Sequence, residues 1–167
     1  MVKLIACIGP NGELGKENDL VYCNKEDMEF FRLTTSGHVV IMGYNTFLSL
    51  GSRPLPNRKN IVLTEDFHAS TDKVEFVNAS LNKVLEMVRN KYPNKEIFII
   101  GGAYVYNQAI SLKLADELLL TIMNYGAPAD VYINIDLIRD NYKPIGKIKN
   151  VKENNVAVGK IIKFTRR

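Results

Sequence analysis

The sequence predicts an α/β protein with a mainly parallel central sheet, and three features support this prediction. Short, wholly apolar runs such as Val39–Met42 and Ile97–Ile100 are typical of strands that are buried on both faces. Amphipathic helical patterns alternate with these runs. After Leu112 the patterns become strand-rich, which predicts an antiparallel edge at the C-terminal end of the sheet.

We expect about eight strands and about four helices, in a single domain covering residues 1–167. The predicted strands are Val2–Ile8, Val39–Met42, Asn60–Thr64, Val74–Val77, Ile97–Ile100, Glu117–Met123, Ala129–Ile133 and Val156–Thr165. The predicted helices are Lys25 to about Thr35, Asn45 to about Leu50, Ser80–Arg89, and a segment from Gly102 to about Leu112, with none after it. Turns are expected at Asn124–Pro128 and Asn154-Asn155.

Composition excludes several classes of protein. The net charge of +4 permits an anionic ligand but does not require nucleic acid. No apolar run is long enough to cross a membrane, and Met1–Ile8 predicts a strand rather than a signal peptide. The only cysteines, Cys7 and Cys23, have no metal-site spacing and suggest free thiols in a reducing compartment. We therefore expect a cytoplasmic protein without a metal site.

Asp27 is the first candidate functional residue. At helical spacing it shares a face with Phe30 and Phe31, so a carboxylate lies on the side of the helix that should be buried. One interpretation is structural, because Asn24 is a good N-cap and a carboxylate three residues later can reach back to the cap N–H. The other interpretation is that Asp27 binds a ligand, because a buried charge needs a partner.

Two strand-to-helix junctions are candidate phosphate sites. The strand ending at Met42 runs through Gly43 into a helix, and the strand ending at Ile100 runs through Gly101-Gly102 into another. Glycine lets a ligand approach the backbone, and a helix N-terminus offers free N–H groups. These glycines could also be simple tight turns, and the chain has no dinucleotide-binding G-x-G-x-x-G or phosphate-loop motif.

The basic loop Gly51–Asn60 is a candidate anion site. Arg58 directly precedes a buried strand, and a guanidinium can bind a carboxylate with two hydrogen bonds. We interpret Arg53 and Lys59 as solvated charges and Arg58 as the anchor. His38 and His68 are expected to be structural or surface residues.

Taken together, these motifs resemble the dihydrofolate reductase family along nearly the whole chain. The matching segments are Leu4-Ile5-Ala6, Leu14-Gly15 with Glu17-Asn18, Asp27 with Phe31, Val40-Ile41-Met42-Gly43 with Thr46, Arg53-Pro54-Leu55-Pro56 with Arg58-Lys59-Asn60, Ile99-Ile100-Gly101-Gly102 with Val105-Tyr106, and Thr121. Their order and spacing make the resemblance specific.

The resemblance implies NADPH-dependent reduction of 7,8-dihydrofolate to tetrahydrofolate, which feeds one-carbon and thymidylate metabolism. Asp27 would bind the pterin, Thr121 would support it, and Arg58 would hold the α-carboxylate of the glutamate tail. An apolar slot would be lined by Ile5, Ala6, Leu20, Met28, Phe31, Leu50, Leu55, Ile100 and Tyr106. Its small-molecule partners would be dihydrofolate and antifolates, and the protein would be a monomer.

The resemblance also implies a cofactor site, with a Gly101-Gly102 bond that is usually cis in the family. The cofactor-binding residues would be Ala6, Cys7, Leu14, Gly15, Leu20, Gly43, Tyr44, Asn45, Thr46, Leu63, Thr64, Glu65, Ile100, Gly101, Gly102, Ala103, Tyr104, Val105 and Tyr106. The family usually meets the 2′-phosphate of NADPH with an arginine after the first glycine junction, hydroxyls after the next strand, and a basic residue after the glycine pair. At these places this chain has Tyr44, then Thr64 followed by Glu65 and Asp66, then Tyr104. We therefore expect a reduced preference for NADPH, with NADH as a possible cofactor.

A second departure lies before the first helix. The family usually has Leu-Pro-Trp where this chain has Leu20-Val21-Tyr22. The tryptophan helps to orient an active-site water, and the hydroxyl of Tyr22 could replace it as part of the catalytic machinery. Two alternatives stay open: a pterin or pyrimidine reductase with the same fold, and a nucleic-acid-binding module using the basic segment Lys83–Lys95.

Overall fold

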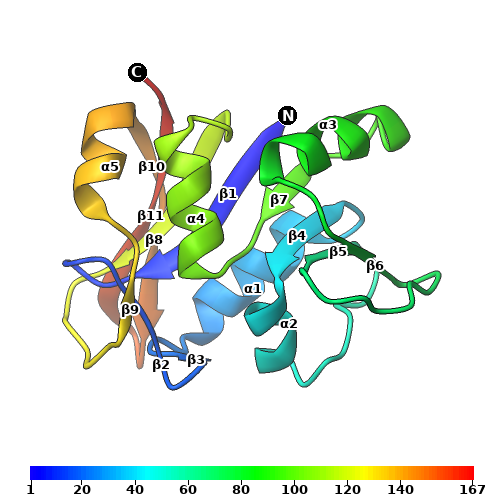
Figure 1. Ribbon diagram of the computed structural model, residues 1–167. Helices are drawn as coiled ribbons and strands as arrows, with labels where there is room; N and C mark the ends of the chain where they lie inside the picture. Colours follow the sequence, from blue (N-terminus) through cyan, green and yellow to red (C-terminus); the bar gives the residue numbers. More distant parts are fainter.

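The computed structural model describes all 167 residues. A central sheet of eight strands has the order β10-β11-β8-β1-β7-β4-β5-β6 (Figure 1). These strands are β1 (Val2–Ile8), β4 (Val39–Gly43), β5 (Lys59–Leu63), β6 (Val74–Val77), β7 (Ile97–Ile99), β8 (Glu117–Met123), β10 (Tyr142–Glu153) and β11 (Val156–Arg166). The helices are α1 (Lys25–Thr35), α2 (Tyr44–Ser49), α3 (Leu81–Lys91), α4 (Ala103–Ser111) and α5 (Ile135–Asn141). No helix is long and apolar enough to cross a membrane.

The pairing of the strands confirms the predicted fold class. From β8 through β1, β7, β4 and β5 to β6, every neighbouring pair is parallel. β11 is antiparallel to β8, and β10 is antiparallel to β11. Parallel neighbours cannot be joined by a tight turn, so the connections cross over, mostly through helices; β5 and β6 are joined by a loop without a helix.

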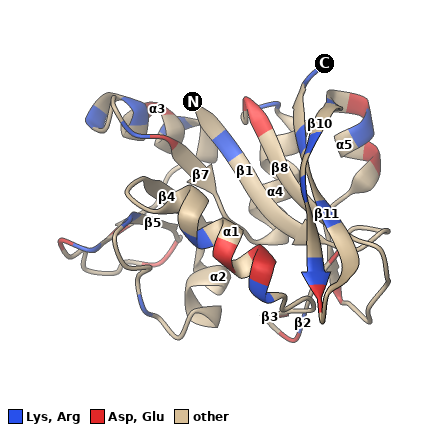
Figure 2. Ribbon diagram, turned by 180° about the vertical axis from the view of Figure 1, so that it is seen from behind, with Lys and Arg blue, Asp and Glu red and all other residues tan.

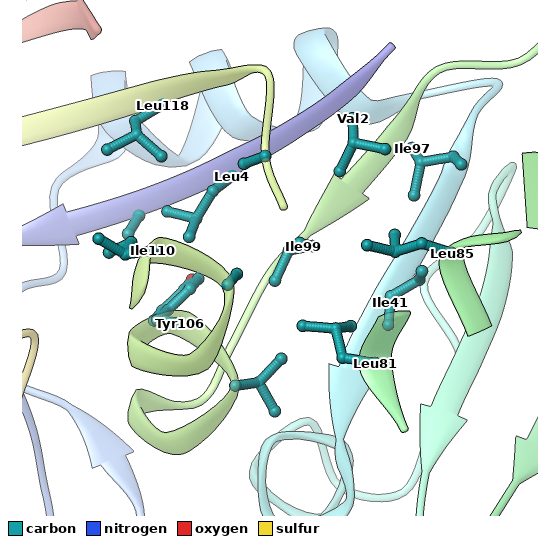
Figure 3. Packing of buried hydrophobic residues seen from close by; sticks show 14 of the residues in the cluster. Val2, Leu4, Ile41, Leu81, Leu85, Ile97, Ile99, Tyr106, Ile110 and Leu118 are labelled. Carbon is teal, nitrogen blue, oxygen red and sulfur yellow. The ribbon is translucent and has the colours of Figure 1, made fainter. Parts of the chain in front are cut away.

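Side-chain alternation along the strands divides the core into two layers. On one face Val2, Leu4 and Ile99 pack with the apolar stripe of α3 and with α4 (Figure 3). That stripe consists of Leu81, Val84, Leu85 and Val88, as predicted, and Ser80 caps the helix by accepting from the Lys83 N–H. On the other face Ile5, Val40, Met42 and Phe98 pack against α2 and the partly buried phenylalanines of α1. Figure 2 shows α1 in front of this second face.

A second, three-stranded sheet lies beside the core. It consists of β3 (Asp19–Leu20), β2 (Glu13–Lys16) and β9 (Val131–Tyr132), in that order. Glu17 and Asn18, between β2 and β3, both have positive φ, which fits a tight hairpin turn. The strand predicted at Ala129–Ile133 is therefore shorter than expected and pairs with β2 instead of the central sheet.

Two elements at the C-terminal end contradict the sequence prediction. Helix α5 follows Leu112, where no helix was expected, so the protein has five helices. The long strand β10 was also missed. It is an edge strand with register shifts near Pro144 and Gly146, and only Tyr142 and Val151 of its residues are buried, so it has no apolar run.

Candidate active site

A cleft of about 1950 Å³ opens at the carboxyl ends of β4, β5 and β7. Forty residues line it, and 19 of these are hydrophobic. Ligands of open α/β sheets bind at this edge, because the loops that follow the strands gather there. The cleft is therefore the candidate active site.

Asp27 faces the cleft from the first turn of α1, near the carboxyl ends of β1 and β8. Its carboxylate accepts a hydrogen bond from the Thr121 hydroxyl. Cys7 and Thr121 are register partners on β1 and β8, so their side chains lie side by side on the face that α1 covers. The predicted N-cap is confirmed, because Asn24 Oδ1 accepts from the Asp27 N–H at 2.9 Å. The Asp27 carboxylate does not complete the capping box and accepts from Thr121 instead.

Two features of the surroundings of Asp27 have opposite effects on its pKa. Burial raises its pKa above the ordinary value, and hydrogen bonds from Thr121 and from the Cys7 thiol lower it in part. The thiol is itself affected, because burial and the Asp27 charge raise the pKa of Cys7. No lysine or arginine forms a salt bridge with Asp27. The carboxylate is a partly desolvated acceptor without a cationic partner.

Arg58 provides a cation at the same end of the cleft. Its Nη1 donates to the Thr35 hydroxyl at 3.0 Å, its Nε donates to the Pro56 carbonyl at 2.9 Å, and its guanidinium lies 5.9 Å from the Phe31 ring centroid. Burial and the nearby Arg32 charge lower its pKa, yet an arginine stays charged. Because both acceptors are uncharged, the guanidinium is oriented while its charge is uncompensated.

The two glycine junctions lie side by side in the cleft. The Gly43 N–H donates to the Gly101 carbonyl at 2.8 Å, and the Gly101-Gly102 peptide bond is cis. Gly101 has φ +134°, and a Cβ added there would lie 3.1 Å from Thr46 Oγ1. Gly102 is the N-cap of α4 and offers no side chain to its first N–H groups. The backbone is thus accessible at a helix N-terminus, as anion binding requires.

The cleft contains all but two of the residues that the sequence predicted for the site. The exceptions are Thr121, which lies behind Asp27, and Tyr22. Tyr22 is 4% exposed and packs with Met123 and Cys7, and its hydroxyl donates to the Tyr125 carbonyl at 2.8 Å. The structure therefore places Tyr22 outside the cleft, next to Cys7, whose thiol donates a hydrogen bond to Asp27.

Several cleft residues were not predicted from the sequence. They come from helices α1, α2 and α4, from the small sheet and its loops, from the loop after β5, and from the segment that runs from β6 into the first residue of α3. These residues are Asn18, Asp19, Lys25, Glu29, Arg32, Ser49, Asp66, Asn78, Ala79, Ser80, Leu81, Gln108, Asp130 and Val131. The segment after β6 could have been found, because β6 is parallel to β5 and its carboxyl end must face the same edge.

Comparison with known proteins identifies the family. The family model described as dihydrofolate reductase matches residues 1–166. The chain belongs to the dihydrofolate reductase family. It is 37% identical over 136 residues to dihydrofolate reductase of Ureaplasma parvum, covering 81% of this chain and 83% of that protein.

Other relatives agree with this membership. Dihydrofolate reductase of Bacillus subtilis is 34% identical over 157 residues, with 92% of this chain and 86% of that protein covered. Among solved structures, dihydrofolate reductase from Enterococcus faecalis complexed with NADP(H) and RAB-propyl has the same fold, with a TM-score of 0.84 and 24% identity over 100% of this chain and 96% of that one. Family membership argues against a nucleic-acid-binding module.

Proposed function

We propose that this chain reduces 7,8-dihydrofolate to 5,6,7,8-tetrahydrofolate, consuming NADPH and a proton and releasing NADP⁺. The observation that carries this proposal is the pairing of two uncompensated charges in one apolar cleft: the Asp27 carboxylate at its floor and the Arg58 guanidinium at its rim. Dihydrofolate has matching groups, a pterin with adjacent N–H donors at one end and carboxylates at the other. The product would feed one-carbon and thymidylate metabolism.

Asp27 would hold the pterin. An ionised carboxylate can accept two parallel hydrogen bonds, one from the pterin amino group and one from a ring N–H. The Thr121 hydroxyl fixes the orientation of the carboxylate. The raised pKa of Asp27 favours uptake of a proton at this end of the cleft, and a water molecule would pass a proton to N5 of the pterin.

Arg58 would hold the α-carboxylate of the glutamate tail. Phe31, Leu50 and Leu55 line the cleft near it and offer an apolar surface to the aromatic linker of the substrate. The same apolar slot would accept antifolate inhibitors. In the free enzyme, burial and the neighbouring Arg32 both disfavour the positive charge of Arg58. A bound carboxylate would stabilise that charge.

The cofactor would occupy the other half of the cleft. The cradle at Gly101 and Gly102 fits a pyrophosphate, because Cβ atoms there would lie 3.1 and 3.2 Å from Thr46 Oγ1 and would fill the space. Bound NADPH supplies the hydride to the pterin carbon beside N5. Ile5, Ala6 and Ile100 line the junction between the two halves and would exclude bulk water there.

The charge distribution in the cleft argues for a weakened preference for NADPH over NADH. The only lysines and arginines that line the cleft are Lys25, Arg32 and Arg58, all on α1 or next to β5. The loop after β5 contributes Glu65 and Asp66 to the cofactor half. A 2′-phosphate gains nothing from these carboxylates, whereas a ribose hydroxyl can donate to them. Comparing KM for the two cofactors tests this, and a preference of about a thousandfold for NADPH would contradict it.

Turnover tests the proposed function directly. NADPH loss is followed with dihydrofolate for the wild type, for Asp27→Asn and for Arg58→Ala. Asp27→Asn should lose roughly 10²- to 10⁴-fold in kcat/KM, the usual contribution of acid–base groups. Arg58→Ala should raise KM for dihydrofolate about tenfold or more, because a charge-assisted bond is lost.

The controls separate tail recognition from general damage. Arg53 lies in the same loop, is exposed and does not line the cleft, so Arg53→Ala should match the wild type. Arg58→Ala should also match the wild type on a dihydropterin that has no glutamate tail. Absence of turnover by the wild type would refute the proposed function.

We further infer that the chain acts as a single-domain, cytoplasmic monomer. One sheet takes strands from Val2 to Arg166, which supports a single domain. Both cysteines are free thiols, which suits a reducing compartment.

A further inference from the structure

Glu13 is the only acidic or basic side chain among the 46 buried residues. It is 4% exposed and forms no salt bridge, and it does not line the cleft. A buried carboxylate without a cation is costly unless hydrogen bonds compensate it. The proposed reaction gives this residue no role, so its contacts call for another explanation.

The carboxylate of Glu13 contacts its own turn, the nearby Tyr22, and a loop 114 positions away in the sequence. Oε1 accepts from the Asn11 N–H at 2.7 Å, and Oε2 accepts from the Ala127 N–H at 3.3 Å. The Tyr22 hydroxyl lies against the same carboxylate and donates to the Tyr125 carbonyl at 2.8 Å. We call Glu13, Tyr22 and these two N–H groups the Glu13 clasp. Its hydrogen bonds outweigh burial and hold the pKa of Glu13 below the ordinary value, so the group is ionised at neutral pH.

Two glycines, Gly9 and Gly126, have no side chain where the clasp lies and so leave room for it. A Cβ at Gly9 would lie 2.1 Å from the Tyr22 hydroxyl oxygen and 2.7 Å from the Glu13 carboxyl carbon. A Cβ at Gly126 would lie 3.0 Å from Glu13 Oε2. The backbone thus approaches the carboxylate closely from both sides, and a side chain at Gly9 would displace both Tyr22 and Glu13.

The clasp lies directly behind the part of the cleft that the small sheet forms. Glu13 is on β2, and successive side chains on a strand point to opposite faces. Its neighbour Leu14 lines the cleft, and so does Leu20 on β3, which is 67% exposed and available to cover a ligand. Tyr22, at the other end of the clasp, packs with Cys7 beside Asp27.

We propose that Glu13 is a positioning residue for the hydride transfer: its buried carboxylate fastens β2 to residues 125–127 and thereby holds Leu14 and Leu20 over the cofactor half of the cleft. The proposal rests on the proposed function. It places the control of cofactor binding on a residue that touches neither substrate nor cofactor.

Glu13→Gln and Tyr22→Phe test the clasp. Glutamine keeps the size but turns an N–H donor toward one of the two backbone N–H groups, so that one contact is lost. Glu13→Gln should raise KM and the dissociation constant for NADPH roughly tenfold, the effect of one lost bond to a charged group, with a smaller change in KM for dihydrofolate. Tyr22→Phe keeps the packing, removes only the hydroxyl, and should shift the same constants in the same direction.

A matched control and a readout independent of turnover make the test decisive. Glu117 is a partly buried glutamate that pairs with Lys3 and Lys163 on the central sheet, so Glu117→Gln should change stability but not NADPH binding. Amide hydrogen exchange should speed up at residues 9–22 and 125–127 in both clasp variants, Glu13→Gln and Tyr22→Phe, and stay unchanged there in Glu117→Gln. If the wild type does not reduce dihydrofolate, the proposed function is refuted but the clasp is not. Direct titration with NADPH then still tests the clasp.

Two results would overturn the clasp. One is that NADPH binding and exchange at residues 9–22 in both clasp variants stay within about twofold of the wild type. The other is that Glu117→Gln weakens NADPH binding equally. If Glu13→Gln does not fold, Tyr22→Phe decides the question by the same measurements.

Discussion

Replacing Tyr106 by phenylalanine removes one buried hydroxyl that connects α4 to β1. The hydroxyl donates to the Ile5 carbonyl at 2.7 Å, and Tyr106 and Ile5 are only 4% and 5% exposed. Phenylalanine fills the same space, so the cost is that of leaving the carbonyl without this donor, about 1–3 kcal/mol. For a chain of this size each kcal/mol lowers Tm by roughly 2–4 °C, so we expect a fall of about 2–12 °C.

Tyr142 provides a matched comparison at a site remote from the cleft. Its hydroxyl donates to the Ala115 carbonyl at 2.7 Å, and the side chain is 0% exposed. Tyr142→Phe should therefore lower Tm by a similar amount. Because Tyr106 and Ile5 both line the cleft and Tyr142 does not, only Tyr106→Phe should also raise KM for dihydrofolate or NADPH.

Thermal unfolding and steady-state kinetics on the two variants check this reasoning. Equal kinetic damage in both variants would show that the effect is not local to the cleft. An unchanged Tm in both would show that these hydroxyl bonds contribute nothing net to stability.

Three further outcomes are expected. Asp27→Asn should stabilise the fold at neutral pH although it lowers kcat/KM. Burial raises the folded pKa of Asp27, so its ionisation costs stability as pH rises from the ordinary value of 3.8 through the folded value. Urea unfolding at several pH values should show this loss of stability in the wild type and a smaller one in the variant. Thr121→Val should raise the pKa of Asp27 further, because the ionised carboxylate loses a hydrogen-bond donor. The acid limb of the pH–rate profile should therefore move to higher pH, and an unchanged limb would contradict the role of Thr121. Leu85→Ala should cost about 2–5 kcal/mol, because a side chain that is 1% exposed leaves a cavity; the urea midpoint should fall while KM stays constant, and a raised KM would argue against a local effect.

Much of the fold could be predicted from the sequence because buried elements have periodic apolar patterns. The runs Val39–Met42 and Ile97–Ile99 are strands, and the stripe of α3 is buried as expected. The turn at Asn154-Asn155 was also predicted, and both residues have positive φ. β10, on the other side of that turn, was missed because an exposed edge strand needs no apolar pattern.

The candidate site divides in the same way. Motifs that follow buried strands, such as Gly43 and the Gly101-Gly102 pair, were placed by the sequence at the edge where the cleft opens. Tyr22 could not be placed. Its neighbours in the sequence suggest an active-site loop, whereas its position depends on a carboxylate from β2 and a carbonyl from residue 125.

By itself, the sequence determined the fold class, the family and the identity of the chemical groups, because local patterns and motif order are written along the chain. Only the tertiary structure decided how these groups are paired. It joined the carboxylate of Asp27 to Thr121 rather than to the N–H of its helix cap, left Arg58 without an anionic partner, and buried Glu13 between two loops. These pairings depend on contacts between residues about 20 to more than 100 positions apart, and no local pattern encodes such contacts.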